Sequence, residues 1–164
     1  MKNLDKSALL ETLRSRLAEE ISTMSRIALE AAAAVSHEDN KPENDKDMRS
    51  TEASYLARGQ AERARELERG LALLSSMPLR SFSSGERISA SALVELESRG
   101  ATIIGFVLPA GGGQRLPAGS ISMEVQVITP TSPLGKALMG LTEGDTAEVA
   151  TPQGVRTYEI VSVL

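Results

Sequence analysis

Two runs of apolar residues with helical spacing dominate the first half of the chain. In each run the apolar positions recur at steps of three and four residues, which places them on one face of a helix. The first run is Leu10, Leu13, Leu17, Ile21, Met24, Ala28, Ala31 and Val35, and the second is Ala53, Ala57, Ala64, Leu67, Leu71 and Leu74, interrupted by Gln60. The two runs predict two long helices that pair along a heptad-like seam. Asp5 or Ser7 can cap the start of the first helix.

The segment between the two runs, residues 37–47, lacks periodicity and is dense in charge. It contains Pro42, which cannot continue a helix and biases the preceding residue away from helical geometry. We therefore predict an antiparallel helical hairpin over residues 1–78, with an acidic tip near residues 37–52. Large aliphatic residues fill the seam near its base and small ones fill it near the turn, so the hairpin is expected to taper towards the tip.

The character of the sequence changes at residue 79, after which glycine, proline and β-branched residues become frequent. Ser132 can cap a short helix over residues 132–139, Pro133 suits its first position, and Gly140 can end it. Residues 110–119 are predicted as a long turn. Strands are predicted at residues 88–97, 102–108, 121–129, 147–150 and 155–163, the last two joined by the turn 151–154. The chain is thus predicted to be an α+β protein whose second domain, residues 79–164, is a small bent antiparallel sheet with one short helix.

Composition narrows the classes of function. The net charge is -4 and the pI is about 5.2, which argues against direct, charge-driven or sequence-specific binding to DNA and favours a protein partner. With two tyrosines, two phenylalanines and no tryptophan, the core must be aliphatic. The absence of cysteine excludes disulfides, zinc fingers and thiol nucleophiles. No signal peptide and no membrane-spanning run is apparent, so we expect a cytoplasmic protein without a membrane partner.

The acidic tip is the strongest candidate for chemistry. Glu43, Asp45 and Asp47 lie within it, and clustered carboxylates bind hard cations such as Mg²⁺ through oxygen. The alternative interpretation is a solvated acidic turn. His37, the only histidine, is a weaker candidate because it has no evident partner. The glycines 111–113 are also weaker candidates, because they lack the lysine and the hydroxyl residue of a phosphate-binding loop.

A more specific signal lies between residues 128 and 145, which read Ile-Thr-Pro-Thr-Ser-Pro-Leu-Gly-Lys-Ala-Leu-Met-Gly-Leu-Thr-Glu-Gly-Asp. This segment resembles the C-terminal domain of the bacterial GreA/GreB family of transcription elongation factors. In that family a Ser-Pro-hydrophobic-Gly/Ala-basic-Ala-Leu-hydrophobic-Gly run precedes a Gly-Asp turn. The continuation through the Thr-Pro-Gln-Gly turn to Tyr158-Glu-Ile-Val also resembles the family's last two strands, and the helical half agrees in architecture.

The resemblance implies an FKBP-like C-terminal domain that docks on bacterial RNA polymerase at the rim of its secondary channel. Ser132, Pro133 and Leu134 would then contact the polymerase, although Ser132 and Pro133 are equally explained as helix-capping residues. The hairpin would enter the channel, where Glu43, Asp45 and Asp47 would help to hold the second Mg²⁺ of the polymerase active site and stimulate cleavage of backtracked RNA. The chain would be a monomeric accessory factor, not an enzyme, with no cofactor of its own.

The tip sequence leaves an alternative open. Cleavage-active members of the family carry Asp, two residues, Glu-Asn and soon a Glu-Tyr or Asp-Tyr pair. Here Glu43-Asn44 is present, but Asn40 stands three residues before Glu43 and no tyrosine follows closely. The alternative is a regulator or inhibitor that enters the channel without stimulating cleavage. A prolyl isomerase or chaperone, which needs an aromatic pocket, and a coiled-coil adaptor unrelated to polymerase are the remaining hypotheses.

Overall fold

The computed structural model describes the backbone of residues 4–38, 46–118 and 124–164, and the side chains of these residues except 34–38 and 46–50. The described chain forms two compact units. One comprises residues 15–72, and the other comprises residues 1–14 together with residues 73–164.

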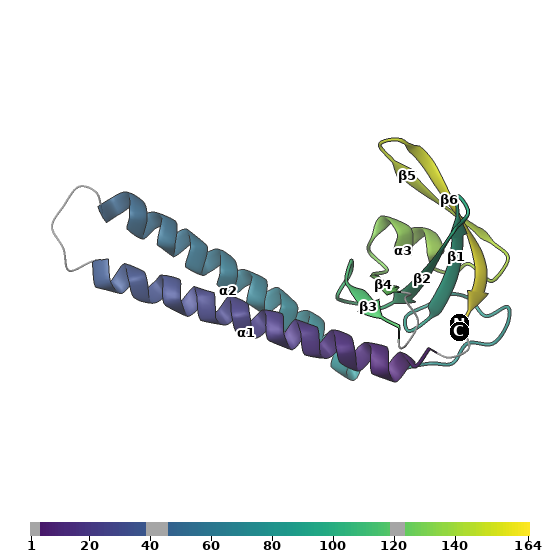
Figure 1. The fold of residues 1–164 in the computed structure, drawn as a ribbon, viewed down its shortest axis with the longest axis horizontal. Helices are drawn as coiled ribbons and strands as arrows, with labels where there is room; N and C mark the ends of the chain where they lie inside the picture. Colours follow the sequence, from purple (N-terminus) through teal and green to yellow (C-terminus); the bar gives the residue numbers. More distant parts are fainter. Residues whose placement is uncertain (1–3, 39–45, 119–123) are drawn as a thin grey trace. The chain divides into compact units, whose positions relative to one another are not determined.

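The predicted pair of helices is confirmed (Figure 1). Helix α1 spans Lys6–Glu38 and helix α2 spans Lys46–Ser76. The Asp5 carboxylate accepts hydrogen bonds from the backbone N–H groups of Ser7 (2.8 Å) and Ala8 (3.3 Å), so Asp5 caps α1. With 33 residues and a rise of 1.5 Å per residue, α1 is about 50 Å long. Neither described helix is long and apolar enough to cross a membrane.

The hairpin unit is held together along the predicted seam. Leu17, Ala64 and Leu67 are buried, whereas Ala28 and Ala53, further along the hairpin, are only partly buried. This gradient agrees with the predicted change from large to small residues. Ion pairs on the outside, such as Arg63 with Glu66 at 3.1 Å, are exposed to solvent and contribute little to stability. The hairpin therefore depends on aliphatic packing.

The second unit is built on a six-stranded sheet with one short helix, α3 (Pro133–Leu138), as Figure 1 shows. The strand order is β3-β4-β2-β1-β6-β5. The predicted α+β class is thereby confirmed. The strands are β1 (Leu93–Ser98), β2 (Ala101–Val107), β3 (Arg115–Pro117), β4 (Glu124–Ile128), β5 (Thr146–Thr151) and β6 (Gly154–Val163).

Three details of the sheet differ from the sequence prediction. The sheet is mixed and not wholly antiparallel, because β2 and β4 pair in parallel. Residues 88–92 do not join β1; Ser91 has a positive φ of 72°, and the backbone of Ile88 instead bonds to Gly140 and Leu141 at the exit of α3. The expected long turn at 110–119 contains β3, whose Leu116 is fully buried opposite Val125.

Both faces of the sheet are covered by aliphatic side chains. On one face α3 packs on Val94, Leu96 and Ile160 in a continuous cluster of buried residues. The register places Leu93 opposite Phe106, and their side chains project from the other face, where both are buried. Residues of the first turns of α1 belong to this unit. The Leu13 side chain lies so close to the backbone of Gly111 that a Cβ atom added to Gly111 would be only 2.8 Å from the Cδ1 atom of Leu13.

A polar cluster connects the start of α1 to the segment after α2. The ammonium of Lys6 donates a hydrogen bond to the carbonyl oxygen of Arg80 at 2.6 Å and lies 4.8 Å from the ring centroid of Phe82. Arg80 forms an ion pair with Glu86. Partial burial, reinforced by the positive charge of Arg80 and opposed by Glu86, lowers the pKa of Lys6 from 10.5 to about 8.

Replacement of Leu13 by alanine is expected to lower the free energy of unfolding by about 2–5 kcal/mol, because this side chain is fully buried and its removal leaves a cavity. Leu29→Ala is the matched control, since Leu29 lies on the same helix but is 72% exposed; its effect should stay within about 0.5 kcal/mol. Urea unfolding followed by circular dichroism measures both. Equal effects of the two substitutions would contradict the assignment of Leu13 to the core.

The lowered pKa of Lys6 predicts a specific dependence of stability on pH. Between pH 8 and 10.5 the unfolded chain keeps the lysine proton while the folded chain has lost it. Since the unfolded state binds more protons in this window, the contribution of Lys6 to stability increases as the pH rises. Unfolding free energies of the wild type and Lys6→Met, whose side chain still covers Phe82, should therefore diverge in favour of the wild type from pH 8 to 10. A constant difference would contradict the prediction.

Candidate functional site

The start of α3 has the capped geometry that the sequence predicts. Ser132 is extended, with φ -68° and ψ 157°, and its hydroxyl oxygen accepts the backbone N–H of Gly135 at 3.1 Å. The same hydroxyl donates to the carbonyl oxygen of Thr129 at 2.7 Å. Pro133 occupies the first helical turn. A backbone N–H at this position would have no acceptor within the helix, so proline loses no hydrogen bond there. These bonds fix the direction in which residues 132–134 leave the preceding loop.

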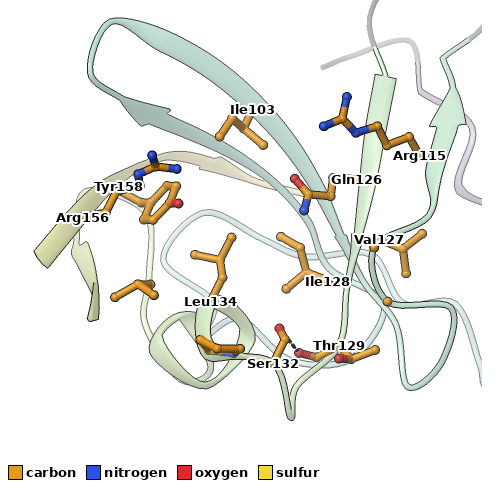
Figure 2. Close-up of a pocket in the computed structure, with 14 residues that line it drawn as sticks. Ile103, Arg115, Gln126, Val127, Ile128, Thr129, Ser132, Leu134, Arg156 and Tyr158 are labelled. Carbon is orange, nitrogen blue, oxygen red and sulfur yellow. Dashed lines mark hydrogen bonds between the residues drawn. The ribbon is translucent and has the colours of Figure 1, made fainter. Parts of the chain in front are cut away.

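A pocket of about 660 Å³ opens beside this helix start (Figure 2). Its volume is in the range of pockets that bind ligands or partner side chains. It is formed by the same face of the sheet on which α3 packs, and by α3 itself. The lining residues are Ile103, Gly112, Gly113, Arg115, Gln126, Val127, Ile128, Thr129, Ser132, Pro133, Leu134, Val149, Arg156 and Tyr158.

The pocket unites the predicted partner-binding residues Ser132, Pro133 and Leu134 in one wall. Pro133 is exposed, whereas Leu134 is partly buried against the core cluster. The other walls come from residues that sequence reasoning missed, among them Ile103 and Tyr158. Strand alternation could have placed them on one face, but their meeting beside α3 depends on sheet order, which the sequence pattern does not give.

The electrostatics of the pocket are set by two guanidinium groups. Arg115 lies 3.4 Å from the carboxylate of Glu124 across the β3–β4 pair, so a neighbouring acid offsets its charge. Arg156 is exposed and lies directly opposite Val149 in the β5–β6 register. No aspartate or glutamate is among the lining residues in the described part of the chain.

The Gly-Asp turn of the sequence motif is formed as expected. The Asp145 carboxylate accepts hydrogen bonds from the backbone N–H of Thr142 at 2.8 Å and from its hydroxyl at 2.9 Å. These bonds lower the pKa of Asp145 below its ordinary value. Gly144 supplies the positive φ of 87° that the turn requires. The turn leads directly into β5 and so helps to position Val149 in the pocket wall.

The candidate residues at the hairpin tip are not tested by the structure. Glu43 and Asp45 lie outside the described residues, and Asp47 belongs to the first turn of α2 but its side chain is not described. His37 belongs to the last turn of α1, and its side chain is likewise outside the described set. Among the residues that are described, no group of three or more His, Asp or Glu side chains could hold a metal ion. The metal-binding hypothesis for the tip stays a prediction.

Comparison with known proteins identifies the class to which this domain belongs. Residues 117–164, which include α3 and the last two strands, match the family described as transcription elongation factor GreA/GreB, C-terminal. The chain is 32% identical over 102 residues to the transcription elongation factor GreA of Polaromonas naphthalenivorans, covering 62% of this chain and 61% of that protein. It is 54% identical over 37 residues to the GreA of Hyphomonas neptunium, covering 23% of this chain and 24% of that protein.

Residues 117–164 carry the C-terminal domain of the GreA/GreB family, as the C-terminal motif predicted. The chain aligns with about three fifths or less of the length of these two relatives. Among solved structures it is similar to GreA factor homolog 1 of Thermus thermophilus, with 25% identity, a TM-score of 0.37, and coverage of 92% of this chain and 94% of that one.

Loss of the Ser132 cap is expected to destabilise the unit that contains α3. Ser132→Ala should lower the free energy of unfolding by about 1 kcal/mol, whereas Ser132→Asp, which can cap in the same way, should lose much less. Ser84→Ala is the control, because Ser84 is exposed in a turn. Thermal unfolding by calorimetry measures all three. If Ser132→Ala and Ser84→Ala unfold at the same temperature, the cap does not contribute as described.

Proposed function

We propose that the chain is a transcription elongation factor that binds bacterial RNA polymerase through its C-terminal domain and inserts its helical hairpin into the secondary channel. The observation that carries the proposal is the family match over residues 117–164, which includes the capped helix start beside a pocket. A surface that combines an exposed proline, a partly buried leucine and an open apolar pocket is suited to a protein partner. The net charge of the chain, -4, also favours a protein partner over a nucleic-acid partner.

The hairpin has the features that a probing element needs. Helix α1 alone, at about 50 Å, is long enough to reach deep into a channel, and its aliphatic seam keeps the two helices paired. Glu43, Asp45 and Asp47 would act at the tip. Their carboxylate oxygens would add ligands for a weakly held Mg²⁺ of the polymerase active site, where a second ion assists hydrolysis of backtracked RNA. The protein would thus need no cofactor of its own and would act as an accessory factor.

A second function, regulation or inhibition of polymerase without cleavage, is favoured by the tip sequence. The Glu43-Asn44 pair is retained, but no tyrosine follows within the next ten residues. Tyr55, the first one, lies on α2 and is 70% exposed. The two functions share the docking step and the entry of the hairpin, and they differ only in what the tip carboxylates do.

A transcript-cleavage assay separates the two functions. Purified core polymerase, halted in a backtracked complex with end-labelled RNA, should shorten its transcript faster in the presence of the wild-type chain. The triple variant Glu43→Ala, Asp45→Ala, Asp47→Ala should lose at least about 90% of this stimulation, on the order of the tenfold change that 1.4 kcal/mol produces. It should still bind the polymerase, because docking uses the other end of the chain.

The matched control replaces three exposed acids of α2, Glu62, Glu66 and Glu68, by alanine. This variant carries the same change in charge and should keep full stimulation. Binding by the wild-type chain without any shortening of RNA would exclude the cleavage function and support the non-cleaving regulator. Absence of binding would refute both.

A further inference from the structure

The two edges of the sheet differ in how well they are protected from pairing with another strand. At one edge lies β3, which has three residues and ends in Pro117, a residue without a backbone N–H. At the other edge lies β5, which has six residues, contains neither proline nor lysine, and keeps an unbroken register with β6. Figure 1 shows β5 as the outermost strand on its side of the sheet. Short length, proline, lysine and irregular pairing protect an edge, so β3 is a protected edge and β5 is an open one.

The β5–β6 register identifies the backbone groups that β5 leaves unpaired. Thr151 and Gly154 face each other across a two-residue turn, and in such a hairpin this closing pair exchanges backbone hydrogen bonds. Because bonded and non-bonded pairs alternate in an antiparallel ladder, the N–H and C=O groups of Thr146, Glu148 and Ala150 point away from β6. All three residues are exposed, and within the described ranges no other element bonds to their backbone. These groups can pair with one added strand.

Acidic side chains lie beside this edge on the sheet face opposite α3. Ala147 and Val149 belong to the core cluster on the α3 face, so Glu148 between them projects from the other face. Glu159 shares that face, because it lies opposite Thr146 in the register.

These carboxylates favour a cationic partner. Glu97 of β1 lies directly opposite Glu159, and two like charges in such a pair repel each other. Glu97, Glu148 and Glu159 are exposed, and none of them forms an ion pair with another described residue. An added strand would lie about 4.8 Å from β5, which is close enough for lysine or arginine side chains to reach Glu148 and to offset the repulsion.

The face that carries α3 asks for apolar side chains instead. Ala147 and Val149 are buried there in the core cluster, so apolar side chains of an added strand would extend this cluster. Because successive residues of a strand project from opposite faces, the segment that fits alternates cationic with apolar residues. A second copy of β5 fits less well, because it would bring another Glu148 to the edge.

We propose that β5 binds an extended segment of a partner protein, in which cationic and apolar residues alternate, as an added strand of the sheet. The backbone groups of Thr146, Glu148 and Ala150 provide the pairing, and the carboxylates of Glu148 and Glu159 select cationic side chains. This interaction does not depend on the function proposed above, because it uses neither the hairpin tip nor residues 132–134.

An NMR titration of the full-length, isotope-labelled chain tests the proposal. The probe is a synthetic heptapeptide with blocked ends and the sequence Lys-Val-Lys-Val-Lys-Val-Lys. The amide signals of Thr146, Glu148 and Ala150 should shift, and their hydrogen exchange should slow, because these N–H groups become bonded. A peptide with glutamate in place of every lysine should bind at least about tenfold more weakly.

Two N-methylated peptides separate strand pairing from simple attraction between charges. In an added strand only every second N–H faces β5. Methylation of the lysine nitrogens alone therefore affects one set of backbone groups, and methylation of the valine nitrogens alone affects the other. One of the two peptides, according to the direction of the added strand, should bind at least about tenfold more weakly than the unmethylated peptide. Equal affinities of the two methylated peptides would overturn the proposal.

A matched pair of protein variants tests the selection by charge. Glu148→Lys reverses the charge at the edge and should weaken binding by at least about tenfold. Glu19→Lys makes the same change of charge on α1, where Glu19 is exposed, and should bind like the wild type. Thermal unfolding checks that both variants keep the fold.

Three further results would contradict the proposal. Equal affinities of the two variants would show that Glu148 selects nothing. Signal shifts confined to residues 37–52 would assign the peptide to the acidic tip. A dimer of the free chain in analytical ultracentrifugation, with slow exchange at Thr146, Glu148 and Ala150, would assign the edge to a second copy. Each of these results leaves polymerase binding intact, since that function is measured with polymerase and uses other residues.

Discussion

The packing of α3 against one face of the sheet is the interaction on which the candidate site depends. Leu138 is fully buried and belongs to the same cluster as Ile128 and Ile160, so a single aliphatic core joins the helix to both halves of the sheet. Because hydrophobic packing is non-directional, the direction of α3 is set by the cap at Ser132. Together they place Leu134 at the edge of the core and leave the pocket open beside it.

The hairpin illustrates a different balance of forces. Its seam is buried near the base, at Leu17, Ala64 and Leu67, and only partly buried further along, at Ala28 and Ala53. Within the seam, the side-chain oxygen of Gln60 is buried without a hydrogen-bond partner in the described structure. Such a residue costs stability but can disfavour alternative helix registers. In a long hairpin, the gain in correct alignment of the two helices offsets this loss of stability.

Much of this architecture could be predicted from local patterns. The two helices followed from apolar spacing, and α3 followed from Ser132, Pro133 and Gly140, because caps and breakers act on neighbouring residues. Features set by distant residues could not be predicted in this way. The three-residue strand β3 exists only because β4 pairs with it, the parallel β2–β4 pairing depends on the path of the chain, and the positive φ of Ser91 ends a strand that propensity alone would extend. The pocket was missed for the same reason: Tyr158 and Leu134 are brought together by topology.

Residues 117–164 carry the match to the GreA/GreB family, and we propose that they contact RNA polymerase. Site-specific photo-cross-linking tests it directly. A photoreactive amino acid in place of Pro133, on the pocket rim, is compared with one in place of Val161, which is 42% exposed in β6 but outside the pocket lining. We predict that the probe at position 133 forms a cross-link to a polymerase subunit and that the probe at position 161 does not. Equal cross-linking at both positions, or none at position 133, would contradict the account.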